Sequence, residues 1–240
     1  VHLEMLHNID KNKGMSNVQN FKTNFDKNEI EGKKYAIKFK SVGFQYFNSQ
    51  ENIFSNLNLE IEKNSHVVIT GQNGSGKSTL LGLLSGVFYP TEGKVECYSK
   101  KIAYVGAKPM ILNSSLRDNL IYGCEEKVED SILEDYLKKF KVFNNSSNTN
   151  LLFEVSNKSL SSGQMQKISF IRALIMNPDT LILDESTANL DLESKELIFN
   201  ILENLNLTIV NSTHNIESLA TYDKHYGIVK TEKGSDLILY

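Results

Sequence analysis

The stretch "HVVITGQNGSGKST", His66–Thr79, joins a short apolar run to a glycine-rich loop. The next run, "STLLGLLSGV", has an apolar face and predicts a helix. The loop has the spacing Gly71-x-x-x-x-Gly76-Lys77-Ser78, which cradles phosphates when a strand precedes it and a helix follows it. A glycine-rich turn that binds nothing is the alternative, and the flanking elements argue against it.

Each residue type in this loop suits an anion. Glycines let the backbone curl so that its N–H groups face the β- and γ-phosphates of a nucleotide. Lys77 adds a positive charge there, and the Ser78 hydroxyl is placed to bind Mg²⁺. The sequence therefore predicts nucleotide contacts from Gly71, Gln72, Asn73, Gly74, Ser75, Gly76, Lys77, Ser78 and Thr79.

Apolar strands and amphipathic helices alternate along the chain. The runs "KIAYV" (101–105), "TLILDE" (180–185) and "LTIVNSTH" (207–214) are typical of buried strands. Two helical stripes lie between them, made of Ile132, Leu133, Tyr136, Leu137 and Phe140, and of Leu197, Ile198, Ile201, Leu202 and Leu205. Residues 35–47 and 57–63 alternate apolar with polar and predict an antiparallel layer. The pattern indicates an α/β fold with a parallel-sheet core.

Composition excludes several classes of protein. The 26 Lys and Arg against 29 Asp and Glu leave a net charge of -3, which disfavours a nucleic-acid partner. The sequence has neither an apolar run of about 18 residues nor a signal-peptide pattern. Cys97 and Cys124 lack metal-ligand spacing and are interpreted as small buried side chains in a reducing cytosol.

The N-terminal region differs from the rest of the chain in composition and in hydrophobic pattern. Residues 8–32 are rich in Asn and Lys without a hydrophobic period, and "VHLEMLHNID" before them is typical of the end of an incoming helix. We therefore expect residues 1–32 to be a linker from an upstream region. Residues 33–240 are expected to form the folded domain, a size that allows a substantial core.

Two acids end the buried strand "TLILDE". Asp184 is placed to hold Mg²⁺, directly or through water. Because side chains alternate along a strand, Glu185 is expected to point another way, toward the γ-phosphate, and to orient or deprotonate a water molecule. Such a pair often only terminates a strand, but its combination with the glycine loop favours catalysis.

His214 and Tyr46 are weaker candidates. A lone histidine is most often structural, but His214 closes a core strand at its carboxyl end, where α/β sheets bind ligands. We expect His214 to hydrogen-bond the γ-phosphate. Tyr46 precedes the glycine loop and is interpreted either as a core residue or as an aromatic that stacks on a purine.

The pentapeptide "LSSGQ", Leu160–Gln164, opens a helix-like run and is a second candidate anion site. Together "GQNGSGKST", "LSSGQMQKISFIRAL", "LILDESTANLD" and "NSTHN" resemble, in order and spacing, the ATP-binding cassette (ABC) ATPases over about residues 35–230. The resemblance implies a P-loop NTPase (RecA-like) core, an antiparallel β subdomain and an inserted helical signature subdomain at about 108–165.

In this family two cassettes pack head to tail, and each ATP lies between the phosphate loop of one and the signature of the other. The resemblance therefore explains two anion sites on one chain, as halves of different pockets. It implies ATP and Mg²⁺ as ligands, with Glu185 as catalytic base, His214 as switch and Lys77 on the phosphates. It further implies that Tyr46 stacks on adenine, that Ser161, Ser162, Gly163 and Gln164 bind ATP on the partner, and that Asp191 reaches across the dimer.

The sequence departs from the family at two positions. Ala107 follows "IAYVG" where the family usually has a glutamine that touches Mg²⁺ and the attacking water, so metal and water are expected to be held less firmly. Ser162 replaces the usual glycine of the signature and needs room for a hydroxymethyl group.

The short segment before "IAYV" and the run "ILNSSLRDNLIYG" resemble exporter cassettes, although the exporter loop is barely recognisable in "LLFEVSNKS". This resemblance implies ATP-driven export at the cytoplasmic face of a membrane, with a transmembrane domain fused upstream. One alternative is a regulatory cassette with little turnover, suggested by Ala107. Another is a soluble, non-transport ABC ATPase, which the acidic balance and the short span from Lys77 to Leu160 disfavour.

Overall fold

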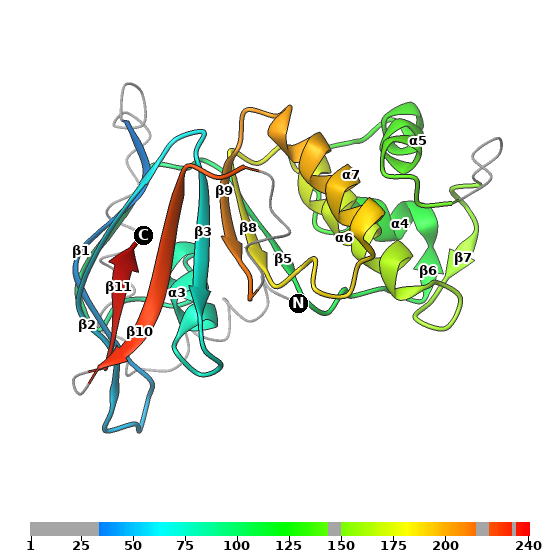
Figure 1. Cartoon of the computed structure of the whole chain (residues 1–240). Coiled ribbons are helices and arrows are strands. Elements are labelled where there is room, and N and C mark those ends of the chain that lie inside the picture. Colours follow the sequence, from blue (N-terminus) through cyan, green and yellow to red (C-terminus); the bar gives the residue numbers. More distant parts are fainter. Residues whose placement is uncertain (1–33, 144–149, 215–220, 232–233) are drawn as a thin grey trace. The chain divides into compact units, whose positions relative to one another are not determined.

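A computed structural model describes residues 34–143, 150–214, 221–231 and 234–240 (Figure 1). The chain divides into two compact units: residues up to Lys100 together with Tyr222–Tyr240 form the first, and Lys101–Thr221 form the second. The predicted linker at 8–32, the incoming helix before it and most of the polar loop after Phe143 lie outside the described residues. Within the described ranges, no helix combines the length and apolarity that a membrane span requires.

The first unit contains the predicted antiparallel layer. Its strands run in the order β4-β1-β2-β11-β10-β3, with β1 antiparallel to both β2 and β4, and with β3 parallel to β10. Figure 1 shows helix α3 beside the strands of this unit. The elements are β1 (Tyr35–Gln45), β2 (Asn52–Glu62), β3 (His66–Gly71), α3 (Lys77–Leu84), β4 (Glu92–Cys97), β10 (Lys224–Thr231) and β11 (Gly234–Leu239).

Burial explains why α3 forms although it is short. A helix that is apolar almost all round is stable only when neighbours cover it. Leu80, Leu81, Leu83 and Leu84 are fully buried, and α3 packs against β3. The sheet contributes alternating apolar residues such as Phe39 and Ile61. This packing holds the loop between β3 and α3 at both ends.

The second unit contains a parallel sheet and helices α4 to α7. Strands β5, β8 and β9 are parallel in the order β9-β8-β5, and their register aligns Gly106, Asp184 and Ser212 at the carboxyl ends. Ligands of α/β sheets bind at this edge. The elements are β5 (Ile102–Gly106), β6 (Ser114–Ser115), α4 (Leu116–Ile121), α5 (Asp130–Lys139), β7 (Glu154–Val155), α6 (Ser162–Ile175), β8 (Thr180–Asp184), α7 (Leu192–Glu203) and β9 (Thr208–Ser212).

These elements confirm the predicted α/β fold, including the helices that precede and include the signature. The helical stripes are narrower than predicted. In α5 the buried residues are Leu133 and Leu137, whereas Ile132 is 47% exposed. Leu205 lies beyond the end of α7 and is 38% exposed. Cys97 is buried as predicted, but Cys124 is only partly buried.

Candidate active site

The phosphate loop of the first unit leads from β3 into α3 as predicted. Gly76 has φ 104°, a left-handed conformation that glycine adopts without strain, and an added Cβ would lie 3.0 Å from both Ile53 Cγ2 and Phe54 Cζ. Gly76 is also the N-cap of α3, and no side chain caps this helix. The first N–H groups of a helix have no intrahelical acceptor, so those of α3 can bind an anion.

Lys77 lies over the loop that precedes it. Its side chain is 6% exposed, and its Nζ donates to the carbonyl oxygens of Gly71 at 2.9 Å and Gln72 at 3.2 Å. Ser75 Oγ is buried without a hydrogen-bond partner among the described residues, whereas Ser78 is exposed at the first turn of α3. A phosphate would fit the buried ammonium of Lys77, the unsatisfied hydroxyl of Ser75 and the uncapped start of α3. A hard cation such as Mg²⁺ would fit the exposed hydroxyl of Ser78.

Tyr46 directly follows β1 and packs beside α3. Its hydroxyl lies 2.8 Å from Thr79 Oγ1, and its ring stands edge-on to Phe44 and Phe88, with centroids 5.0 and 5.7 Å away. The residue nevertheless remains 42% exposed. Tyr46 is therefore oriented by its neighbours but not enclosed, which disagrees with the core interpretation and leaves surface for a ligand.

Asp184 ends β8 in the second unit and accepts a hydrogen bond that the sequence analysis missed. Tyr104 Oη donates to Asp184 Oδ2 at 2.7 Å. Burial, and then the interaction with Asp184, raise the pKa of the Tyr104 phenol, so the hydroxyl keeps its proton and acts as donor. The contact depends on the parallel register, which pairs Tyr104 with Ile182 on the face of the sheet that carries Asp184, and a single sequence does not reveal this register.

Glu185 and His214 meet at the same edge. His214 Nε2 lies 2.7 Å from Glu185 Oε1, and both side chains remain partly exposed. The backbone N–H of Glu185 donates to Ser212 O at 3.0 Å. The structure thus brings together the two residues that the sequence predicted separately.

The reason given for the direction of Glu185 was wrong. The prediction relied on strand alternation, but β8 ends at Asp184 and Glu185 has φ 50°. A left-handed conformation costs a non-glycine residue about 1–2 kcal/mol. A strained turn therefore aims this carboxylate, and such outliers are concentrated at functional sites.

The signature residues form a helix start. Ser161 is the N-cap of α6: Gln164 N donates to Ser161 Oγ at 3.2 Å, and Ser161 N donates to Gln164 Oε1 at 2.9 Å. This reciprocal pair is a capping box, and its Ser-x-x-Gln spacing was readable from the sequence. Ser162 is exposed, and Gly163 lies next to it in the first turn.

Asp191 has a local role of the same kind. It is the N-cap of α7, and its Oδ1 accepts from Ser194 N at 2.8 Å. The N–H of Ser194 lowers the pKa of the Asp191 carboxyl, which therefore stays ionised at neutral pH. The positive end of the helix macrodipole favours a negative charge at this position.

The end of β5 differs from what the family resemblance implies. Ala107 offers no polar side-chain atom there. Gln166, which is 4% exposed on α6, donates from Nε2 to Gly106 O at 3.1 Å. This amide anchors the end of β5.

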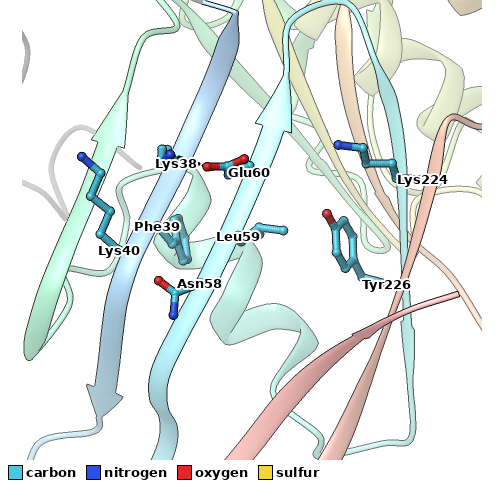
Figure 2. A pocket seen from close by; sticks show the side chains of 8 residues that line it. All are labelled: Lys38, Phe39, Lys40, Asn58, Leu59, Glu60, Lys224 and Tyr226. Carbon is cyan, nitrogen blue, oxygen red and sulfur yellow. Dashed lines mark hydrogen bonds and ion pairs between the residues drawn. The ribbon is translucent and has the colours of Figure 1, made fainter.

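A hollow of about 500 Å³ lies elsewhere on the first unit and contains none of the predicted site residues (Figure 2). Figure 2 shows Lys38 paired with Glu60 across β1 and β2. Lys40 and Lys224 form ion pairs with Glu96 and Glu62. The lysines of this hollow are therefore neutralised within the fold. The lining residues are Lys38, Phe39, Lys40, Asn58, Leu59, Glu60, Lys224 and Tyr226.

Several known proteins have sequences similar to that of this chain. Over 219 residues the chain is 35% identical to the "Mating factor M secretion protein mam1" of Schizosaccharomyces pombe, with 83% of this chain and 16% of that protein aligned. Over 230 residues it is 34% identical to the "Multidrug resistance-like ATP-binding protein MdlB" of Buchnera aphidicola subsp. Schizaphis graminum, covering 89% of this chain and 39% of that protein. The chain thus spans less than half the length of either relative.

A solved structure shows the same fold. The structure of a bacterial Atm1-family ABC exporter with ATP bound superposes with a TM-score of 0.72 over 81% of this chain and 37% of that one, at 23% sequence identity. The sequence model of the family described as "ABC transporter" matches residues 54–188, which is more than half of the chain. The chain therefore belongs to the ABC transporter family.

Proposed function

We propose that the chain is an ATP-binding and ATP-hydrolysing cassette that powers export across a membrane. The observation that carries this proposal is the Glu185–His214 contact of 2.7 Å, next to Asp184 at the carboxyl ends of β8 and β9. A carboxylate fixed beside an imidazole suits the activation of water. The uncapped helix start behind Gly76 supports phosphate binding.

Each residue has a defined task in this proposal. The loop from Gly71 to Thr79 binds the phosphates through its N–H groups, with the charge of Lys77 on the β- and γ-phosphates. Ser78 and Asp184 would hold Mg²⁺, which supplies positive charge against the phosphate oxygens. Glu185 accepts a proton from the attacking water, and His214 hydrogen-bonds the γ-phosphate.

Two such chains would complete the sites. We place Ser161, Ser162, Gly163 and Gln164 on the ATP of a partner cassette, where the N–H groups of Ser162 and Gly163 at the start of α6 would face its phosphates. The ionised Asp191 reaches toward the same boundary. Because each chain carries both halves, a two-fold pair has two equivalent sites.

Membership of the family supports a proposal for the wider assembly. We propose residues 1–32 as the connection to a transmembrane domain, and residues 33–240 as the nucleotide-binding domain with its helical subdomain at about 108–165. The cassette then lies at the cytoplasmic face of a membrane. Nucleic acid is not among the proposed partners, in agreement with the net charge of -3.

Phosphate release tests this function. The purified chain is expected to hydrolyse ATP in the presence of Mg²⁺, at a rate per chain that rises with protein concentration because the site needs two copies. A dilute, demonstrably monomeric sample with the same rate per chain would contradict the paired site. Binding of ATP with no turnover above background would instead support the regulatory alternative suggested by Ala107.

Substituting Tyr46 tests the adenine contact. Stacking on an aromatic ring contributes about 1–3 kcal/mol per base, so we expect Tyr46→Ala to weaken ATP binding about 5- to 150-fold. Tyr46→Phe keeps the ring, loses only the contact with Thr79, and should bind far better. The matched control is Phe47→Ala, because Phe47 is the next residue and is 87% exposed.

Calorimetric titration with ATP and with inorganic triphosphate checks the assignment. Only the ligand with a base should lose affinity. An equal loss for both ligands would show that Tyr46 acts on the loop and not on the base.

A further inference from the structure

The Tyr104 hydroxyl has no task in the function proposed above, although it contacts one of its central groups. In the parallel pairing of β5 with β8, Tyr104 lies opposite Ile182, and Gly106 lies opposite Asp184. Side chains two residues apart on a strand share a face, so the Tyr104 ring lies on the face that carries the Asp184 carboxylate. The donor reaches Asp184 Oδ2 at 2.7 Å.

We propose that Tyr104 is a positioning residue for the metal site: its hydroxyl fixes the rotation of the Asp184 carboxylate and leaves Oδ1 as the oxygen offered to Mg²⁺. This inference rests on the proposed function, because it assumes that Asp184 holds the metal. It assigns a task to a residue on β5, a strand from which the proposed function takes no group.

The physical reason is the freedom of a carboxylate. The terminal torsion of an aspartate is broad and nearly two-fold, so an unrestrained Asp184 presents either oxygen in many orientations. A hydrogen bond to an ionised acceptor is short and strong, and this one restricts the carboxylate before the metal arrives. The donor is placed by the backbone, since Tyr104 lies within β5, and its side chain is 39% exposed.

The residues around Asp184 leave the orientation of its carboxylate to the Tyr104 hydroxyl. Ala107 has no side-chain donor, and the Gln166 amide donates to Gly106 O. Within the described part of the chain, Tyr104 is the side chain that hydrogen-bonds the carboxylate. Hydrogen-bond partners of metal ligands typically change metal affinity or activity 10- to 100-fold when removed.

The test compares nucleotide affinity with and without metal. A fluorescent, non-hydrolysable ATP analogue is titrated into the chain with saturating Mg²⁺ and again with EDTA. The ratio of the two affinities is the gain due to the metal. We expect Tyr104→Phe, which removes only the hydroxyl, to lower this gain about 10- to 100-fold while the affinity in EDTA stays unchanged. In ATPase assays the half-saturating Mg²⁺ concentration should rise, with activity recovered at high Mg²⁺.

A matched control separates this effect from the loss of any tyrosine hydroxyl. Tyr98 in the first unit also donates to a carboxylate, at 3.0 Å from Glu96 Oε2, and Tyr98→Phe should leave the gain unchanged. Melting temperatures without nucleotide show whether each variant is folded. If Tyr104→Phe unfolds, Tyr104→Ile is the second donor-free variant, because a β-branched side chain suits a strand.

A double substitution decides whether Tyr104 acts through Asp184. Asp184→Asn should itself remove most of the gain, and adding Tyr104→Phe should then have little further effect. An unchanged gain in Tyr104→Phe, or an equal loss with Mg²⁺ and with EDTA, would overturn the inference and leave the proposed function intact. If the unaltered chain shows no gain from Mg²⁺, the proposed metal site itself is wrong.

Discussion

Replacing Glu185 by glutamine is expected to leave a chain that binds ATP with Mg²⁺ but hydrolyses it about 10²- to 10⁴-fold more slowly, the usual contribution of a general base. The amide has the shape of the carboxylate and can remain 2.7 Å from His214, but it cannot take a proton from water. Binding should survive because the proposed phosphate contacts come from the Gly71–Thr79 loop. The ATP-loaded pair of chains should therefore accumulate.

Two measurements check this expectation. Phosphate release gives the rate, and gel filtration with saturating ATP and Mg²⁺ gives the state of association. Glu193→Gln is the matched control, because Glu193 is an exposed acid on α7 whose partner is Lys141 at 3.4 Å. A Glu185→Gln chain that turns over ATP at the original rate, or elutes as a monomer under these conditions, would contradict the scheme.

The direction of the Glu185 carboxylate shows where sequence reasoning fails. The acidic pair at the end of an apolar strand was readable, since strand periodicity is local. The left-handed φ of 50° was not, because β-propensity and alternation say nothing of how the chain leaves a strand. Sequence reasoning therefore singled out Glu185 for an incorrect geometric reason.

Contacts between strands mark a second limit. The Tyr104–Asp184 bond joins residues 80 positions apart, and the Tyr46–Thr79 bond joins residues 33 apart. Each depends on register and packing, which a single sequence does not reveal. The glycine loop and the Ser161–Gln164 capping box are local patterns and were readable, although the sequence analysis interpreted the signature only as an anion site.

Lys77 is the second residue whose loss should have a large effect. Its ammonium is buried and donates to the Gly71 and Gln72 carbonyl oxygens, so it is already aimed across the loop that follows β3. A hydrogen bond to a charged group contributes about 1.5–3 kcal/mol. Because 1.4 kcal/mol corresponds to a tenfold change in affinity, Lys77→Ala should weaken ATP binding about 10- to 100-fold.

The same two carbonyl contacts mean that Lys77→Ala also removes a support of the loop. Comparing ligands separates the two effects. A lost phosphate contact should weaken the binding of ATP more than that of ADP and leave adenosine binding unaffected, because Tyr46 is the proposed contact of the base. A collapsed loop should weaken the binding of all three ligands. Lys94→Ala, an exposed lysine 3.3 Å from Glu96 in the same unit, controls for the loss of a positive charge. Unchanged ATP affinity in Lys77→Ala would show that Lys77 does not contact the phosphates. Phosphate binding would then depend on the backbone N–H groups of α3 and its loop alone.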